Sequence, residues 1–162
     1  MAGLRIAVAA DNAGVALKND LATLMRDDDR VAEVADFGVP DDGDDRAYPL
    51  LGLAAAQAVA DGRADRAVLV CGTGIGMAIS ANKVEGIRAT VAHDSYSAER
   101  SVKSNDCQVL CMGGRVIGPE LAKKIVGEWL GYAFDPASAS ATKVAHITEF
   151  EKTHATPTDA AC

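Results

Sequence analysis

The sequence predicts a doubly wound, Rossmann-like α/β fold, in which a sheet of about five parallel strands lies between two layers of helices as an α/β/α sandwich. Short apolar runs alternate with helix-length segments along most of the chain. The runs are continuous, which is typical of strands that are buried on both faces of a parallel sheet. Hydrophobic residues make up 49% of the chain and aromatic residues only 4%, so we expect a core of Val, Ile, Leu and Ala.

The first two strand and helix pairs span residues 4–62. The apolar run LRIAVAA (4–10) leads through the turn sequence DNAG into the helix-like segment VALKNDLATLMRD (15–27). The run VAEVADFG (31–38) leads through an acidic loop into YPLLGLAAAQAVADG (48–62). Each pair therefore has the order expected of a strand and its crossover helix.

The next two pairs follow the same order. The apolar run RAVLVCG (66–72) passes through a glycine-rich turn into GMAISANKV (76–84). IRATVAHD (87–94) leads into SYSAERSVKSND (95–106), where the sequence Asp94-Ser95 is typical of a helix N-cap. We assign Met77, Ile79 and Trp129 to core packing.

The fifth pair joins CQVLCMGG (107–114) to PELAKKIVGEWLGYAF (119–134). After it, small polar residues precede an apolar stripe at helical spacing, formed by Val144, Ile147 and Phe150. A helix left over after a completed sheet must bury this stripe elsewhere. We therefore expect it to pack on a partner subunit, in a homodimer.

The chain is thus expected to form one α/β domain over residues 1–135. Residues 136–154 form a C-terminal arm helix of the same domain, and residues 155–162 are expected to be a disordered tail.

Composition excludes several classes of protein. The formal net charge is −7, and no cluster of Lys and Arg suits a nucleic-acid backbone. No apolar run approaches the roughly 20 residues of a membrane span. The N-terminal MAGLRIAVAA is typical of a first strand rather than a signal peptide, so we expect a cytoplasmic protein with no membrane partner. The four cysteines form no metal-binding pattern, and Cys107 and Cys111 suit buried positions.

The carboxyl ends of parallel strands collect ligands, so the residues that follow each strand form one candidate site. Besides the glycine-rich turn, they are Asp11 and Asn12, His93 and Asp94, and Gly113 to Arg115. The glycines of the turn give G-x-G-x-G, not the G-x-G-x-x-G of a dinucleotide loop, and the turn follows the third strand instead of the first. A nucleotide-binding or sensing module is therefore the alternative rather than the main hypothesis.

The catalytic hypothesis centres on Cys71, which ends a strand immediately before a helix N-terminus. That position favours a thiolate. Alternate glycines let backbone N–H groups line an anion hole, which suits proton removal next to a carbonyl with the enediolate held by the loop. On spacing alone, a packed cysteine beside a glycine turn explains the pattern equally well.

Several motifs in order over residues 4–150 carry a family resemblance. They are AADNAG, LK, YP, CGTGIGMAISANKVEGIRA, YSAE, SND and VLCMGGRVIGPELAKKIVGEWL. The chain resembles the type B ribose-5-phosphate isomerases and their galactose-6-phosphate isomerase relatives. The resemblance implies an aldose–ketose isomerase of carbohydrate metabolism, of the kind that serves the pentose phosphate pathway. It implies catalysis through a cis-enediolate without metal or cofactor, in a homodimer or dimer of dimers with shared active sites.

The resemblance also implies roles for particular residues. Cys71 matches the base, and Thr73 matches a residue that handles protons at the sugar oxygens. The enediolate is held by the loop of Gly72, Thr73, Gly74, Ile75 and Gly76. Asp11 matches a sugar-hydroxyl contact, Asn105 an active-site asparagine, and Arg115 a phosphate-side arginine supplied across the dimer.

Four positions depart from the family pattern. Asn12 stands where the family usually has histidine, and Ser104 stands where it has the ring-opening histidine. Of the family's two arginines near the start of the last helix, one aligns with Lys143 and the other with Ala139 or Ser140. Lysine can still hold a phosphate, without the bidentate fork of arginine.

The missing ring-opening histidine suggests an acyclic substrate. A four-carbon sugar phosphorylated on O4 cannot close a furanose ring, so a tetrulose 4-phosphate such as erythrulose 4-phosphate needs no ring opening. Two alternatives keep ribose 5-phosphate as substrate: His93 opens the ring, or the enzyme uses the small open-chain fraction.

Overall fold

The computed structural model describes residues 3–154 and contains one five-stranded sheet with the strand order β2-β1-β3-β5-β4. All four pairings are parallel. The strands are β1 (Leu4–Ala10), β2 (Val31–Asp36), β3 (Arg66–Cys71), β4 (Ala89–Val91) and β5 (Val109–Gly113). The predicted α/β sandwich is confirmed.

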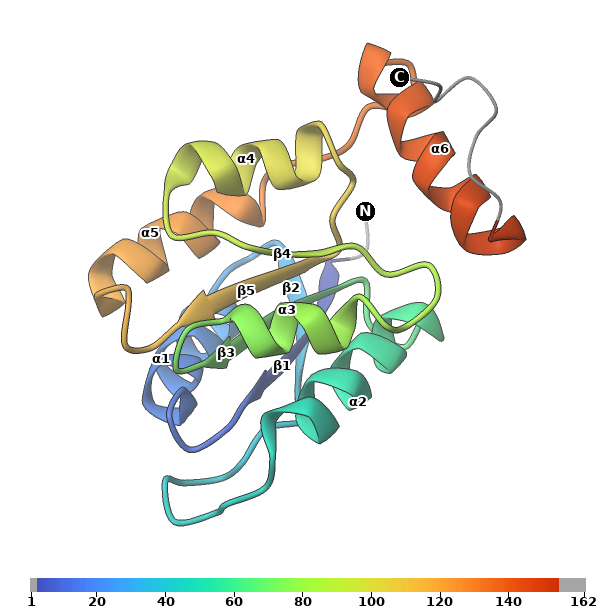
Figure 1. Cartoon of the computed structure of the whole chain (residues 1–162). Coiled ribbons are helices and arrows are strands. Elements are labelled where there is room, and N and C mark those ends of the chain that lie inside the picture. The colour runs from blue at the N-terminus through green and yellow to red at the C-terminus, as the bar shows by residue number, and fades with distance from the viewer. Residues whose placement is uncertain (1–2, 155–162) are drawn as a thin grey trace.

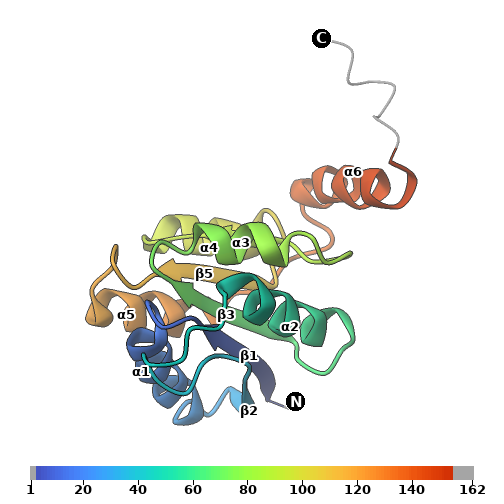
Figure 2. The same ribbon diagram turned by 60° about the horizontal axis from the view of Figure 1, so that its bottom comes forward.

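Helices cover both faces of the sheet (Figures 1 and 2). They are α1 (Val15–Arg26), α2 (Tyr48–Ala60), α3 (Ile75–Ala81), α4 (Ser95–Lys103), α5 (Pro119–Trp129) and α6 (Ala139–Thr153). One core cluster joins α1, α4 and α5 to the sheet, and the other joins α2 and α3 to its opposite face. Successive residues along β1, β3 and β5 face the two clusters alternately, so these strands are buried throughout or nearly so. Burial on both faces explains their continuous apolar runs.

Strand β4 is much shorter than its apolar run suggested. The predicted strand covered residues 87–94, whereas the ladder ends at Val91. Asp94 accepts a hydrogen bond from the Ser97 N–H (2.7 Å) and caps α4, so the chain must leave the sheet before residue 94. The predicted N-cap is thereby confirmed, and it is the reason that the strand stops early.

Helix α5 also ends earlier than predicted, at Trp129. The Arg66 guanidinium donates to the carbonyl oxygens of Trp129 (2.9 Å) and Tyr132 (2.5 Å), and it lies over the Trp129 ring. These contacts satisfy carbonyl groups at the helix terminus. Trp129 and Met77 are fully buried, as expected, but Ile79 is 57% exposed and is not a core residue.

Helix α6 stands away from the sheet sandwich in both ribbon views (Figures 1 and 2). Of its predicted apolar stripe, Val144 is buried, whereas Ile147 and Phe150 are about half exposed. The predicted tail, residues 155–162, lies outside the described residues. Within residues 3–154, the helices are all too short or too polar to cross a bilayer.

Candidate active site

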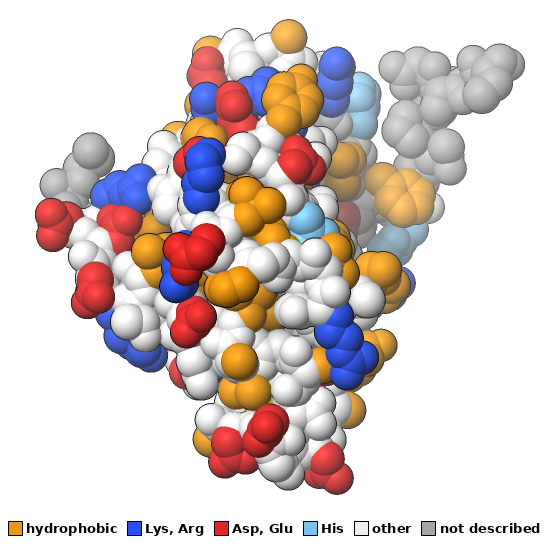
Figure 3. Space-filling model, turned by 90° about the vertical axis from the view of Figure 1, so that its left-hand side faces the viewer, with side chains coloured by type: hydrophobic (Ala, Val, Ile, Leu, Met, Phe, Trp, Pro, Cys, Tyr) orange, Lys and Arg blue, Asp and Glu red, His pale blue; other side chains and the backbone are white. Residues whose placement is uncertain are grey.

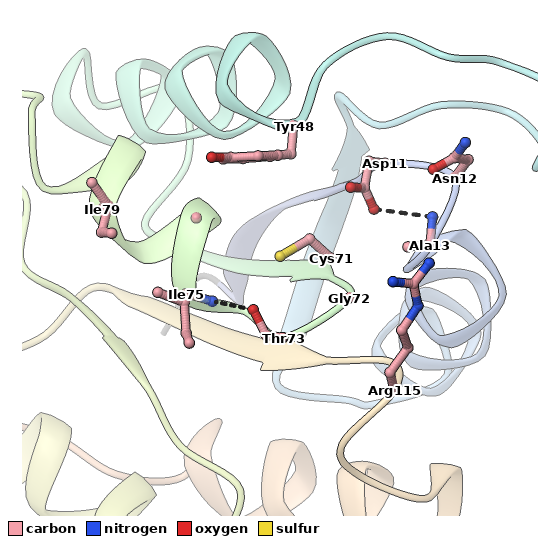
Figure 4. Close-up of a pocket in the computed structure, with 11 residues that line it drawn as sticks. Asp11, Asn12, Ala13, Tyr48, Cys71, Gly72, Thr73, Ile75, Ile79 and Arg115 are labelled. Atoms are coloured by element: carbon pink, nitrogen blue, oxygen red, sulfur yellow. Dashed lines mark hydrogen bonds between the residues drawn. The ribbon is translucent and has the colours of Figure 1, made fainter.

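The glycine loop lies where the chain connections of the sheet reverse direction. Strand β1 connects outward to β2 on one side, while β3 lies on its other side and leads toward β5 and β4. Doubly wound sheets bind ligands at this switch point, outside the carboxyl ends of the strands. Asp11 follows β1 and Cys71 ends β3, so the two residues meet at this position (Figure 4).

Cys71 is held by the loop that follows it. Its sulfur accepts a hydrogen bond from the Gly74 N–H at 3.1 Å, and the residue is only 5% exposed. Gly74 has a φ of +80°, a left-handed conformation that costs glycine little, and this turn directs the N–H back toward the sulfur. An N–H donor stabilises negative charge on its acceptor, so the contact suits a thiolate.

The loop also offers backbone donors. The Ile75 N–H faces the Thr73 hydroxyl at 3.3 Å, whereas among residues 3–154 the N–H groups of Gly72, Thr73 and Gly76 have no hydrogen-bond acceptor. Unpaired N–H groups at a cavity wall are suited to an oxyanion. The loop therefore has unpaired backbone donors at the cavity wall, whereas the N–H groups of Gly74 and Ile75 already have acceptors within the loop.

A cavity of about 490 Å³ opens in front of Cys71. Its walls comprise Asp11, Asn12, Ala13, Tyr48, Cys71, Gly72, Thr73, Ile75, Gly76, Ile79 and Arg115. In Figure 4 the Cys71 sulfur points into the space between Tyr48 and the glycine loop. The volume suits a small metabolite.

Two charged side chains lie at one side of this cavity. The Asp11 carboxylate accepts from the Ala13 N–H (3.1 Å) and the Gly14 N–H (3.2 Å), which fixes it at the end of β1. The Arg115 side chain lies against the loop: a Cβ added to Gly72 would be 3.5 Å from its guanidinium. The cavity thus has a carboxylate for hydroxyl groups and a guanidinium for an anion.

Comparison with known proteins identifies the family. A family model described as ribose/galactose isomerase matches residues 6–147, which is most of the chain. The chain belongs to the ribose/galactose isomerase family.

Individual relatives agree with this assignment. The chain is 57% identical over 148 residues to a Mycolicibacterium smegmatis protein named D-erythrulose-4-phosphate isomerase 2, covering 91% of this chain and 97% of the relative. It is 46% identical to D-erythrulose-4-phosphate isomerase of Pectobacterium atrosepticum, covering 91% and 95%. The solved ribose-5-phosphate isomerase B of Clostridium thermocellum is 41% identical with a TM-score of 0.87, covering 94% of this chain and all of that one.

Membership of the ribose/galactose isomerase family makes this protein an aldose–ketose isomerase that acts on sugar phosphates, as its motifs predicted. The resemblance stated from the sequence is confirmed, and the alternative of a nucleotide-binding module is disfavoured. Among the described residues 3–154, no group of three His, Cys, Asp or Glu side chains is placed to hold a metal ion.

The structure brings most of the predicted residues of this isomerase together, with Arg115 in an unexpected place. The resemblance assigned Arg115 to the site of a partner subunit, whereas its side chain lies at the cavity of its own chain. Arg115 lies there because its N–H donates to the Gly72 carbonyl at 3.1 Å, which holds the turn after β5 against the glycine loop.

Five predicted residues do not line the cavity of their own chain. Gly74, predicted for the anion hole, is one of them, because its N–H is occupied by the Cys71 sulfur. Ser104 and Asn105 follow α4, where the Ser104 N–H donates to the Arg100 carbonyl and the Asn105 carbonyl accepts from Arg88. They precede β5 and so lie at the opposite edge of the sheet. Lys143 is exposed on α6, and His93 contacts the backbone of β5.

Three cavity residues were missed: Ala13, Tyr48 and Ile79. Tyr48 begins α2, and its ring fills the space over Gly76, where an added Cβ would come within 2.3 Å of it. Ile79 lies one helical turn after Ile75, and both are more than half exposed. The YP motif was a signal for Tyr48, but an isoleucine pair at helical spacing is equally typical of a core face.

Two other cysteines are unsuited to act as thiolates. Burial raises the pKa of Cys107 to about 11 and raises that of Cys111 further. Both are free thiols, as expected of buried small residues. Cys71 is the cysteine that lines the cavity.

Proposed function

We propose that this protein interconverts D-erythrulose 4-phosphate and D-erythrose 4-phosphate, with Cys71 as the base. The observation that carries the proposal is the Cys71 sulfur facing a cavity beside free loop N–H groups. In this proposal a proton acceptor and an anion hole lie on the same side of one small space. A proton next to a carbonyl can be removed there, and the charge that develops on oxygen is met by fixed donors.

The proposed reaction begins with the ketose. The Cys71 thiolate takes a proton from C1, and the electron pair moves into the C1–C2 bond while the C2 carbonyl becomes an enediolate oxygen. The loop N–H groups stabilise that oxygen, and the Thr73 hydroxyl passes a proton between O1 and O2. Cys71 then returns its proton to C2, which leaves an aldehyde at C1.

The rest of the cavity supports orientation of the substrate. Asp11 is fixed at the end of β1 and accepts hydrogen bonds, so it suits the sugar hydroxyl groups. Arg115 and Asn12 lie at the cavity wall, where a guanidinium pairs well with a phosphate.

The choice of a four-carbon substrate rests on ring chemistry. Ribose 5-phosphate rests mainly as a closed furanose and must open before a C–H next to a carbonyl exists. This sequence has Ser104 where the family has the histidine assigned to ring opening. A tetrose blocked at O4 cannot form that ring. Two similar relatives are named D-erythrulose-4-phosphate isomerases, which supports the same choice.

The substrate proposal predicts a clear ratio of specificity constants. We expect kcat/KM for D-erythrulose 4-phosphate to exceed that for ribose 5-phosphate by about 10- to 100-fold, the range typical of discrimination between close analogues. Coupled assays of both sugars on one enzyme preparation measure the ratio.

Two controls interpret that ratio. A four-carbon phosphorylated hydroxamate, which mimics the enediolate, is expected to inhibit more tightly than the five-carbon analogue. Ser104→His is expected to raise activity toward ribose 5-phosphate. A preference of the wild-type enzyme for the pentose would contradict the tetrose substrate and would favour ring opening by His93 or use of the open-chain fraction.

A homodimer with shared sites is part of this proposal. Figure 3 looks onto the carboxyl edge of the sheet, where apolar side chains gather across the middle of the face. Tyr48, Ile75 and Ile79 are all more than one-third exposed around the cavity. Residues 136–154, which include α6, would form the arm that packs on the partner. Since Asn105 and Ser104 lie far from the cavity of their own chain, they can act only in the site of another chain.

Shared sites predict complementation between inactive variants. Cys71→Ala lacks the base, and Asn105→Ala lacks a residue that we assign to the neighbouring site. Neither homodimer is expected to be active, but subunits exchanged between them form one site with both wild-type residues. Regained activity in the mixture, with sedimentation to confirm a dimer, supports sharing. No gain after demonstrated exchange would place Asn105 outside the site.

A further inference from the structure

His93 replaces a missing strand contact at the end of β5. The pairing of β4 with β5 stops at Val91. The residue after it, Ala92, makes one further backbone hydrogen bond, from its N–H to the Cys111 carbonyl at 3.2 Å. Two residues further along β5, the Gly113 N–H donates to the His93 Nε2 at 2.8 Å. The half-buried imidazole thus takes the place of a carbonyl that a longer β4 would supply.

Gly113 lies directly beneath the glycine loop. A Cβ on this residue would be 2.6 Å from the Thr73 Cα and 2.9 Å from the Gly72 carbonyl oxygen. No side chain separates the two backbones. A displacement of Gly113 therefore moves the loop itself.

The turn after Gly113 holds the loop from the same side. The Gly114 N–H donates to the Cys71 carbonyl at 2.8 Å, and the Arg115 N–H donates to the Gly72 carbonyl at 3.1 Å. The same turn carries the Arg115 side chain to the cavity. The positions of Cys71, the glycine loop and the Arg115 guanidinium therefore all depend on the position of Gly113.

We propose that His93 is a positioning residue, whose neutral imidazole fixes Gly113 and so aligns the glycine loop and Arg115 for isomerisation. This inference rests on the proposed function of that loop. It assigns His93 a role through the backbone in place of direct contact with the sugar, because its Nε2 is already occupied by the Gly113 N–H.

The proposed role has a pH dependence with a defined sign. A ring nitrogen that accepts an N–H must carry no proton, so the contact is made by neutral His93 with its proton on Nδ1. Burial lowers the pKa of His93, and the neighbouring Asp94 opposes this more weakly. Asp94 is the one charged group among the described residues whose interaction with His93 shifts this pKa. The contact is complete above the ordinary histidine value of 6.5 and is lost as the pH falls through the lowered pKa of His93.

Two substitutions separate the hydrogen bond from the packing of the ring. His93→Gln can place an amide oxygen near the position of Nε2 and does not titrate, whereas His93→Leu fills space without an acceptor. We expect His93→Gln to keep most of the neutral-pH kcat and to show a shallower acid decline than wild type, because protonation of the Cys71 base still lowers kcat but protonation of residue 93 no longer does. We expect His93→Leu to lower kcat by about tenfold or more at neutral pH, with a smaller change in KM, and by less at acid pH, where wild type has lost the same contact.

The measurement is kcat against pH from about 4.5 to 8 at saturating substrate, with far-UV circular dichroism to confirm folding. Saturation matters because the substrate phosphate itself titrates near pH 6. An acid decline in His93→Gln identical to that of wild type, or an unchanged kcat in folded His93→Leu, would overturn the proposal.

A second readout does not need turnover. In wild type the Gly113 amide resonance is expected to shift as His93 titrates, and in His93→Gln it is expected to be constant over the same range. A constant Gly113 resonance in wild type would overturn the contact itself. Absence of isomerase activity in wild type, by contrast, would refute the proposed function and leave this test intact.

Discussion

Replacement of Cys71 by serine or alanine is expected to lower kcat by about 10³-fold or more, because a positioned general base contributes typically 10²–10⁴-fold and here the same sulfur serves both proton transfers. Serine keeps the size and a hydrogen-bond acceptor for the Gly74 N–H, but its hydroxyl is a far weaker acid than a thiol and is not ionised near neutral pH. Steady-state kinetics with D-erythrulose 4-phosphate measure the loss.

The structure provides a matched control for this experiment. Cys107 is also a free, buried cysteine, but it precedes β5 at the opposite edge of the sheet from the cavity. Cys107→Ala is expected to keep the kcat of wild type, and both variants should unfold at similar denaturant concentrations. Near-normal turnover in folded Cys71→Ala would refute the assignment of Cys71 as the base, whatever substrate the enzyme prefers.

The sequence was most informative where burial alone determines structure. Strand β1 and strand β3 have interiors that are apolar on both faces, and their predicted bounds agree with the ladder to within one residue. Strand β4 was predicted too long because its apolar residues continue past Val91. What ends it is a side-chain cap at Asp94 and a hydrogen bond from β5 to His93, and both depend on atoms brought together by the fold.

The candidate site was predictable to the extent that chain topology places residues together. Parallel strands deliver Asp11 and Cys71 to the same edge, so their proximity follows from the fold class. Tyr48 reaches the cavity from the start of α2, beyond a long loop whose path no periodicity describes. Ile79 has the spacing of a core residue, and only the position of α3 at the rim leaves it exposed.

The residues assigned by family resemblance show a different limit of prediction from sequence. Ser104 and Asn105 were assigned to the site by motif, yet they lie at the amino end of β5 and cannot reach the cavity of their own chain. A motif specifies which residues act together but not which copy of the chain supplies each one. The complementation experiment addresses this question.

A methyl group added at Gly113 tests the dependence of the loop on its backbone support. The new Cβ would lie 2.6 Å from the Thr73 Cα and 2.7 Å from its carbonyl carbon, so only a shift of backbone can relieve the contact. We expect Gly113→Ala to cost about 1–3 kcal/mol in the free energy of unfolding, as overpacked sites do. We also expect kcat to fall by about 10²-fold, since a displacement near 1 Å of catalytic groups has that effect.

Gly127 is the matched control, because a Cβ there meets no atom within 4 Å and the residue lies inside α5. Gly127→Ala is expected to keep kcat and to raise the free energy of unfolding by up to about 1 kcal/mol, through the better helix propensity of alanine. Urea unfolding and kinetics on both variants separate the two effects. A Gly113→Ala enzyme that loses stability but keeps kcat would mean that the loop does not depend on β5 for its alignment, and it would contradict the positioning role of His93 as well. If kcat per folded molecule of Gly113→Ala falls, the position of the end of β5 affects catalysis by Cys71.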